Sequence, residues 1–314
     1  MIDFIVYDMT HLRHFAPFTE SLVRLGFKVR WQIVKSSIKY NSISGDDRIQ
    51  RVVDIGRAAG CTLFDYFDQK TSGGCAVTIE TGVPSDKIPS RYDTVISMQH
   101  GFDYTTPSRE SGTNVLNIMW DQIYADHHAT IKQGCKYLIP SVPIPFWIDR
   151  SAAEKVAGSA RIATVFYPEV GYHAEAINAC RELLLHGITP VVKQRRKNQE
   201  VPNISGCMIT YDDIWHPSES IVYPVCSEIC VGFGTSAYTD AVPAGISFVD
   251  CTGPKYSREY LKPSSERYIQ CNPGGEVDAI RSALQVGSSF VETTHNARDE
   301  FAESVMASLS VQRA

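Results

Sequence analysis

The sequence predicts an α/β protein made of two doubly wound, Rossmann-like domains that face each other across a cleft. Three observations predict this fold class. The chain has 314 residues, which is the usual length of two domains. Short apolar runs alternate with helical patterns, as they do in a parallel sheet covered by helices. A proline-rich stretch at 139–160 interrupts the alternation, which then restarts, and this indicates a domain boundary.

The first half of the chain opens with an apolar strand at Ile2–Val6. An amphipathic helix follows, because Phe15, Phe18, Leu22 and Leu25 recur at three- and four-residue steps before Gly26. The pattern then predicts a helix at 48–59 and strands at 29–34, 61–67, 75–80 and 94–98.

The second half repeats this alternation. It predicts strands at 161–166, 189–193, 229–233 and 246–249, and helices at 173–186, 236–242, 276–286 and 289–309. We therefore expect one domain at 1–148 and a second at 149–314, with the option that the last helix returns to the first domain. Ligands of such sheets bind beyond the carboxyl ends of the strands, so the residues that follow each strand are the candidates for function.

Composition and charge exclude several classes of protein. Apolar residues make up 43% of the chain and charged residues 21%, which is typical of a globular protein. The net charge of −5 lies in residues 149–314, which carry 15 basic and 20 acidic side chains, so no nucleic-acid partner is expected. Basic residues around 24–39 leave a weak peripheral contact with anionic lipid open. The oligomeric state stays open too.

The cysteines and the start of the chain indicate a cytoplasmic protein. The nine cysteines are odd in number and lack zinc-ligand spacing, which favours reduced, buried thiols and no metal site. No apolar run reaches the ~18 residues of a spanning helix. The first residues, MIDFIVYDMT, do not form a secretory signal.

The strongest local motif is VGFGTSAYTDAVPAGISFVD at 231–250. Gly234, Thr235 and Ser236 form a turn between a strand and a helix, where glycine lets a ligand approach and hydroxyls lie beside free N–H groups. A phosphate or diphosphate fits this place, and Asp240 could accept a hydrogen bond from a ribose hydroxyl. A plain helix cap explains Thr235 and Ser236 equally well, and an aspartate on a solvated helix face explains Asp240.

Polar residues also follow the strands of the first half. His100 follows the strand at 94–98 and could act as a general base, with Asp103 orienting it or sharing the role. Asp8, His11 and His14 lie in the first strand–helix loop, where an acceptor would enter. Structural roles stay open, since an isolated histidine commonly hydrogen-bonds the backbone and Asp8 could cap the helix at 12–25.

Two further segments could bind phosphate in the second half. Lys193 and Arg195 follow a strand and could neutralise a nucleotide phosphate, although a charged loop is usually only solvated. Ser218 and Glu219 mark a second helix start. The first half has no GxGxxG motif, which argues against an ordinary NAD enzyme.

Together these segments resemble the two-Rossmann glycosyltransferases of the GT-B superfamily, with likeness to the surface-polysaccharide, CDP-glycerol glycerophosphotransferase and Kdo-transferring branches. HLRHFAPFTESLVRLGFKV is similar to the first helix of these proteins, on the acceptor side. Gln99-His100-Gly101 looks like their HG element, in which the histidine is the base. The segment 231–250 is similar to their donor-binding segment. Gln194-Arg195 stands where the glycerophosphotransferases often have Pro-His, which favours sugar transfer.

The resemblance implies an enzyme that moves a sugar from a nucleotide-activated donor to a glycan or lipid-linked acceptor, with inversion, in polysaccharide or glycan biosynthesis. It implies no metal and no cofactor, because fixed protein charges hold the leaving diphosphate. His100, Asp103 and Asp8 would be catalytic, and His11 and His14 would line the acceptor. The donor-site residues would be Lys193, Arg195, Ser218, Glu219, Gly234, Thr235, Ser236 and Asp240. A CDP-glycerol- or ribitol-type phosphotransferase, a nucleotide-sugar epimerase and a non-catalytic nucleotide-sugar binding protein remain alternatives.

Overall fold

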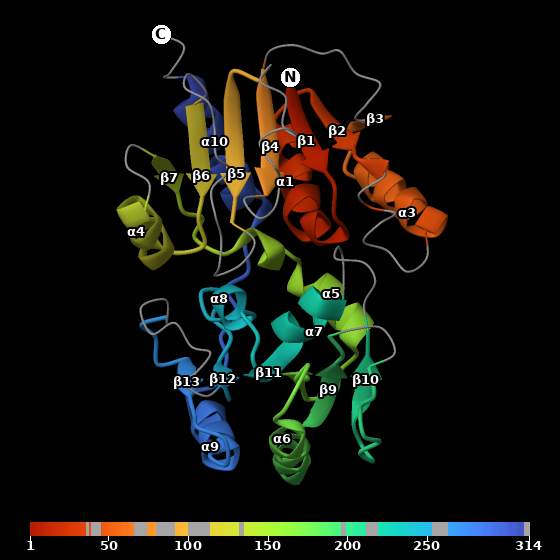
Figure 1. Cartoon of the computed structure of the whole chain (residues 1–314), viewed down its shortest axis with the longest axis vertical. Helices are drawn as coiled ribbons and strands as arrows, with labels where there is room; N and C mark the ends of the chain where they lie inside the picture. The colour runs from red at the N-terminus through yellow and green to blue at the C-terminus, as the bar shows by residue number, and fades with distance from the viewer. Residues whose placement is uncertain are drawn as a thin grey trace. The chain divides into compact units, whose positions relative to one another are not determined.

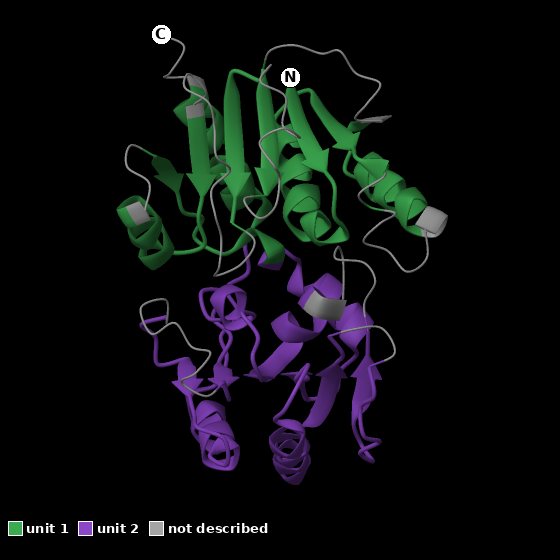
Figure 2. Cartoon of the chain, viewed as in Figure 1, with its two compact units in different colours: residues 1–145, 214–216, 294–314 green, residues 146–213, 217–293 purple. Residues whose placement is uncertain are grey.

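The computed structural model of the chain contains two compact units (Figures 1 and 2). The first is built mainly from Met1–Pro145 and Thr294–Ala314, and the second from Phe146–Asp213 and Pro217–Thr293. The structure describes residues 1–35, 38, 45–65, 74–79, 92–99, 114–131, 135–195, 199–211, 219–252 and 263–310. Each unit is a parallel sheet flanked by helices, so the predicted α/β class with two doubly wound, Rossmann-like domains is confirmed.

The first unit has a seven-stranded sheet in the order β3-β2-β1-β4-β5-β6-β7, with parallel neighbours throughout. Its strands are β1 (Ile2–Val6), β2 (Val29–Ile33), β3 (Thr62–Asp65), β4 (Cys75–Ile79), β5 (Thr94–Met98), β6 (Asn114–Ile118) and β7 (Lys136–Leu138). Its helices are the 3₁₀ turn η1 (Met9–His11), α1 (Leu12–Arg24), α3 (Gly45–Ala58), α4 (Gln122–Ile131) and α10 (His295–Ser310). A second 3₁₀ turn, η3 (Ile144–Phe146), ends this part of the chain.

The central strands are buried on both faces, as parallel strands covered by helices must be. All five residues of β1, β2, β4 and β5 are buried. The predicted strand at Ile2–Val6 is confirmed in full, and the strand at 94–98 as well. The strand β6, the helix α4 and the strand β7 were not predicted, because their apolar residues come in runs of at most three that polar side chains interrupt.

The last helix, α10, packs against α1 of the first unit. Phe18 of α1 lies 6.1 Å from Phe301 of α10, measured between ring centroids, and Phe18 also contacts Phe4 of β1. Arg24 pairs with Asp299 through Nη2 and Oδ1 at 2.7 Å. The helix was predicted at 289–309 but begins at His295, because residues 287–294 form an irregular connection.

The contacts of α10 predict two unequal effects on stability. Phe301 is 9% exposed and fills the space against Phe18, so Phe301→Ala should lower the free energy of unfolding by about 3 kcal/mol. Asp299→Ala removes an ion pair whose side chains are 39% and 22% exposed, and should cost less than ~1 kcal/mol. Urea denaturation of both variants tests this, and equal losses would show that the apolar contact does not dominate.

The second unit has a six-stranded parallel sheet in the order β10-β9-β8-β11-β12-β13. Its strands are β8 (Ile162–Phe166), β9 (Thr189–Lys193), β10 (Met208–Thr210), β11 (Ser227–Gly232), β12 (Phe248–Asp250) and β13 (Tyr268–Gln270). Its helices are α5 (Arg150–Ala157), α6 (His173–Leu185), α7 (Glu219–Cys226), α8 (Tyr238–Ala241) and α9 (Glu276–Val286).

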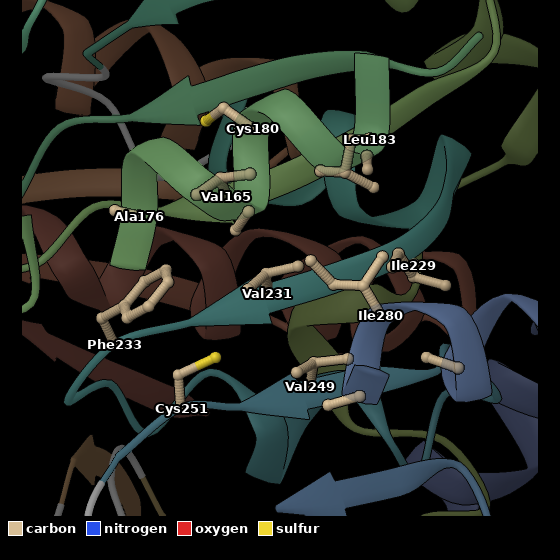
Figure 3. Close-up of a cluster of buried hydrophobic side chains, with 14 of the residues drawn as sticks. Val165, Ala176, Cys180, Leu183, Ile229, Val231, Phe233, Val249, Cys251 and Ile280 are labelled. Atoms are coloured by element: carbon tan, nitrogen blue, oxygen red, sulfur yellow. The ribbon is translucent and has the colours of Figure 1, made fainter. Parts of the chain in front are cut away.

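The core of this unit lies between the central strands and the helices α6 and α9 (Figure 3). Val165 of β8, Val231 of β11 and Val249 of β12 are fully buried there against Leu183 of α6 and Ile280 of α9. The predicted helix 276–286 and strand 189–193 are confirmed. The helix start predicted at Ser218 and Glu219 corresponds to α7, which begins at Glu219. The strands β10 and β13 were not predicted, since they have only three residues each.

Candidate functional site

The strand β11 ends in a turn that carries the predicted donor-site residues. Gly234 has φ +65°, a left-handed conformation that favours glycine, and its N–H donates to Thr252 Oγ1 at 2.8 Å. The next residues, Thr235 and Ser236, are half-buried, and Thr235 Oγ1 accepts from the N–H of Ala237 at 3.2 Å. The turn therefore holds two hydroxyl side chains at the carboxyl edge of the sheet.

Gly232 lets this turn close tightly against the next strand. A Cβ atom at Gly232 would lie 2.5 Å from Phe248 Cζ and 2.6 Å from Thr235 Cγ2. Any larger residue would push Thr235 out of place. Of the two glycines at this turn, Gly232 thus serves packing and Gly234 serves the backbone conformation.

A polar network beyond β12 supports the same turn. Asp250 Oδ1 accepts from the N–H of Thr252 at 2.9 Å, and Asp250 Oδ2 accepts from Tyr268 Oη at 2.7 Å. Thr252 in turn holds Gly234. Sequence reasoning missed Asp250 and Thr252, although they directly follow a predicted strand and so lie at the same sheet edge as Gly234.

Two details of the predicted motif need correction. Asp240 does not lie on a solvated helix face, because its residue is only 4% exposed. The helix α8 has four residues, and its N-cap Ala237 has no side-chain cap. A helix this short has little dipole, so an anion at this place would depend on the turn's own N–H groups and hydroxyls.

The basic side chains after β9 reach the same edge of the sheet. Lys193 ends β9, and its ammonium lies 5.9 Å from the ring centroid of Phe166 on β8. Strands β9 and β11 flank β8, so their ends are roughly 10 Å apart at ~4.8 Å per strand spacing. That span suits a diphosphate held from both sides.

Arg195 is anchored by its neighbours. Gln199 Oε1 accepts from the Arg195 N–H at 2.8 Å, and the guanidinium lies 3.9 Å from Glu169 Oε2. Burial lowers the pKa of Arg195 from its ordinary value, but an arginine stays protonated at neutral pH. A permanent positive charge is therefore present at this edge.

In the first unit, Asp8 caps the turn after β1. Its Oδ1 accepts from the Thr10 N–H at 2.9 Å, so Asp8 caps the 3₁₀ turn η1 rather than the helix α1. His14 is 1% exposed, and its Nε2 accepts from Arg13 Nε at 3.1 Å. That hydrogen bond requires an unprotonated Nε2.

His11 lies inside the unit at the carboxyl end of β1. It is 2% exposed and packs between the rings of Tyr7 and Phe15, at centroid distances of 4.2 and 5.3 Å. Burial lowers its pKa to about 4, despite the opposing charge of Asp8. The imidazole is therefore neutral at physiological pH.

The burial of His11 predicts acid sensitivity of the first unit. Because the folded pKa of about 4 lies below the ordinary 6.5, this contribution to stability is complete above pH 6.5 and is lost as the pH falls towards 4. At pH 5 the loss should be about 2 kcal/mol. Urea denaturation at pH 7 and pH 5 measures it. His11→Phe should shrink the difference between the two pH values, and an unchanged difference would assign it to other groups.

Several predicted site residues lie outside the described residues. His100, Asp103 and Ser218 belong to this group. Glu219 begins α7, but its side chain is not described. Gln99, next to His100, is described: its Oε1 accepts from the Trp120 N–H at 2.9 Å and its own N–H donates to Ile118 O, which fixes the end of β5 to β6.

A cavity of about 480 Å³ lies at the opposite, amino edge of the second sheet. Its charged lining residues are paired, Arg150 with Glu154 and Arg161 with Glu228. The cavity thus offers a ligand little net charge. The carboxyl edge, with its turn and the cations Lys193 and Arg195, is the better candidate for an anionic ligand.

Within the part of the chain that the structure describes, no group of three or more His, Cys, Asp or Glu residues could hold a metal ion. No described helix is both long and apolar enough to cross a membrane.

Comparison with known proteins identifies the fold. No family model and no curated protein matches the sequence. Three solved structures are similar along their length. A Methanocaldococcus jannaschii UDP-GlcNAc 2-epimerase in complex with UDP-GlcNAc and UDP has a TM-score of 0.57 and 6% sequence identity, and the match covers 98% of this chain and 100% of that one. A glycosyltransferase from Rickettsia africae ESF-5 has a TM-score of 0.51 and 10% identity, with coverage of 96% of this chain and 93% of that one. The spinosyn forosaminyltransferase SpnP has a TM-score of 0.50 and 9% identity, with coverage of 97% of this chain and 93% of that one. The chain therefore has the GT-B fold of two Rossmann-like domains.

Proposed function

We propose that the chain is a glycosyltransferase that moves a sugar from a nucleotide-activated donor to a carbohydrate acceptor, without a metal and with inversion at the anomeric carbon. The observation that carries the proposal is the turn after β11. It places the hydroxyls of Thr235 and Ser236 and the left-handed Gly234 at the carboxyl edge of the second GT-B sheet, the edge that also carries Lys193. A glycan or lipid-linked acceptor would complete the reaction.

The donor's diphosphate would lie across the ends of β9 and β11. Lys193 and Arg195 would neutralise it from one side, and the turn at Gly234–Ser236 would donate hydrogen bonds from the other. Ser218 and Glu219 are assigned to the same donor. For Asp240 we propose a supporting place beneath the turn rather than direct contact with the ribose, because it is buried.

The acceptor would bind the first unit, with His100 removing the proton of its hydroxyl and Asp103 or Asp8 assisting. His11 and His14 are buried, so we assign them to the shape of the acceptor side rather than to direct contact. The turn that Asp8 caps is the element that would present this side.

An epimerase acting on a nucleotide sugar is the second candidate. The observation in its favour is the similarity to the M. jannaschii UDP-GlcNAc 2-epimerase, whose TM-score of 0.57 exceeds those of the two glycosyltransferases given above. Both candidates require the same donor site. They differ in the product: transfer or hydrolysis releases UDP from UDP-GlcNAc, whereas epimerisation leaves the diphosphate attached to the sugar.

A thermal-shift panel of UDP-, GDP-, CMP- and CDP-linked donors tests the donor site. A ligand at 100 times its Kd stabilises the folded state by about 2.7 kcal/mol, so one family of donors should raise the melting temperature by roughly 5 °C. If no nucleotide does so, the donor-site assignment is wrong. Product analysis with the donor that binds then separates transferase, epimerase and silent binding protein.

Two glycines provide a matched pair for this assay. Gly234 (φ +65°) and Gly187 (φ +68°) both have left-handed backbones, and a Cβ would meet nothing within 4 Å at either position. Alanine should therefore cost similar stability at both. Only Gly234→Ala should weaken nucleotide binding, by about tenfold (~1.4 kcal/mol), because its Cβ would stand in the path of the phosphate. Equal affinities in the two variants would contradict the placement of the phosphate at this turn.

A further inference from the structure

Two cysteine thiols lie in contact at the carboxyl edge of the second sheet. Cys251 follows β12 and Cys271 follows the edge strand β13, and the two strands pair in parallel with Asp250 opposite Gln270. Their Sγ atoms are 3.4 Å apart. Cys251 is fully buried in the core, where Figure 3 labels it, whereas Cys271 is half-buried.

We propose that Cys251 and Cys271 form a modification site, a dithiol that a small-molecule disulfide of the glutathione type oxidises to an intramolecular disulfide. The inference does not depend on the proposed function. Neighbouring strands lie ~4.8 Å apart, which falls within the Cα separation of ~4.4–6.8 Å that a disulfide spans. The two sulfur atoms need to approach by only about 1.4 Å, since an S–S bond is ~2.05 Å long.

The surroundings give the two thiols different roles. Cys271 is the accessible one, at the sheet's edge strand, and so meets the oxidant first. The hydrogen bond between the two thiols favours the thiolate on Cys271 and lowers the pKa of Cys271, and the same contact together with burial raises the pKa of Cys251. The negative charges of Asp250 and Glu276 raise the pKa of both thiols. Because the thiolate is the attacking form, the reaction should become faster as the pH rises.

The reaction is an ordinary thiol–disulfide exchange in two steps. The Cys271 thiolate attacks one sulfur of the small disulfide, forming a mixed disulfide and releasing one small thiolate. Cys251 then loses its proton and attacks Cys271 Sγ, which forms the bond between Cys251 and Cys271 and expels the second small thiolate. The protein loses two electrons and two protons, and the small disulfide is reduced to two thiols.

The disulfide would link the ends of β12 and β13 covalently. Asp250, one residue before Cys251, holds both Thr252 and Tyr268, so the cross-link would brace this network. The two cysteines are 20 positions apart. A loop of that size restricts the unfolded chain enough to raise the melting temperature by roughly 5 °C.

The test treats the full-length protein with oxidised glutathione, alkylates the remaining thiols and maps the peptides by mass spectrometry. We expect a peptide cross-linked between Cys251 and Cys271, a mass lower by two hydrogen atoms, reversal by dithiothreitol and the rise in melting temperature. Absence of this cross-link from the folded protein, or its formation only in denaturant, would overturn the proposal.

Three variants separate the steps. Cys251→Ala lacks the resolving thiol, so Cys271 should retain one glutathione as a stable mixed disulfide. Cys271→Ser should acquire neither the mixed disulfide nor the cross-link. Cys226→Ser removes another half-buried thiol of the same unit and should still form the cross-link. Glutathione on Cys251 in the Cys271→Ser variant would reverse the assigned roles and refute the mechanism.

Discussion

Replacing Asp3 by Asn is expected to lower the free energy of unfolding by about 3–5 kcal/mol, enough to unfold a marginally stable domain. Asp3 is 1% exposed in the middle of the first sheet, and its cross-strand neighbour Arg30 is 8% exposed. The guanidinium binds the carboxylate with both arms, Nε to Oδ1 at 2.6 Å and Nη2 to Oδ2 at 2.5 Å. Asn keeps the shape but removes the negative charge, so a buried cation remains without its counter-charge.

The other partners of Asp3 strengthen this expectation. Tyr92 Oη donates to Asp3 Oδ2 at 2.7 Å, and Gln32 Nε2 does so at 3.3 Å. The carboxylate thus joins two strands and the residue that leads into β5. An amide could accept only part of these hydrogen bonds, and its NH₂ group would face donors.

A double variant provides the control. Asp3→Leu with Arg30→Met removes both charges together and should be more stable than either single variant, because a buried pair replaced by apolar side chains leaves no unpaired charge. Urea denaturation by circular dichroism measures all three. If the loss of unfolding free energy in the double variant equals the sum of the losses in the two single variants, the two side chains do not act as a pair. Asp299→Ala, at the exposed pair with Arg24, gives the scale for an ordinary surface ion pair.

The same network shows where prediction from sequence stops. The run IDFIV predicts the strand β1, since apolar residues outnumber the single acid. Nothing local indicates that Asp3 is buried, because its partner Arg30 lies 27 positions away on another strand. Periodicity reports local structure, whereas an ion pair between strands depends on the pairing register, which only the folded chain fixes.

The candidate site divides in a similar way. Gly234, Thr235 and Ser236 could be predicted because a strand, a glycine turn and a helix follow each other directly in sequence. The supporting role of Asp250 and Thr252 could not be predicted from the sequence, because it depends on β12 lying beside β11 in the sheet. The four-residue length of α8 was also missed, since the sequence YTDAV at 238–242 continues a helical pattern, whereas the chain turns at 242–245. His11 illustrates the reverse case: a polar residue in a promising loop packs between aromatic rings.

The largest effect on activity is expected at His100. If this histidine takes the proton of the acceptor hydroxyl, His100→Ala should lower kcat by about 10²–10⁴-fold, the usual contribution of a general base. Donor binding should be unchanged, since we assign the donor to the second unit. The measurements are kcat with the donor and acceptor that the panel identifies and the Kd of the nucleotide by titration. Transfer at the wild-type rate would remove His100 from the mechanism.

The pH profile and a second histidine make the test specific to the proton transfer. A base of ordinary histidine pKa, ~6.5, makes kcat/KM of the wild-type protein fall below that pH, and His100→Ala should abolish this limb. His186 is the C-cap of α6, where its side chain is 41% exposed and pairs with Glu182 at 3.1 Å. His186→Ala should keep both the rate and the acidic limb, because it removes an imidazole that we place outside the site. If instead the acidic limb of kcat/KM survives in His100→Ala, another group takes the proton of the acceptor. Asp8→Asn and Asp103→Asn then decide between the two carboxylates, because only replacement of the true base by an amide would abolish the limb.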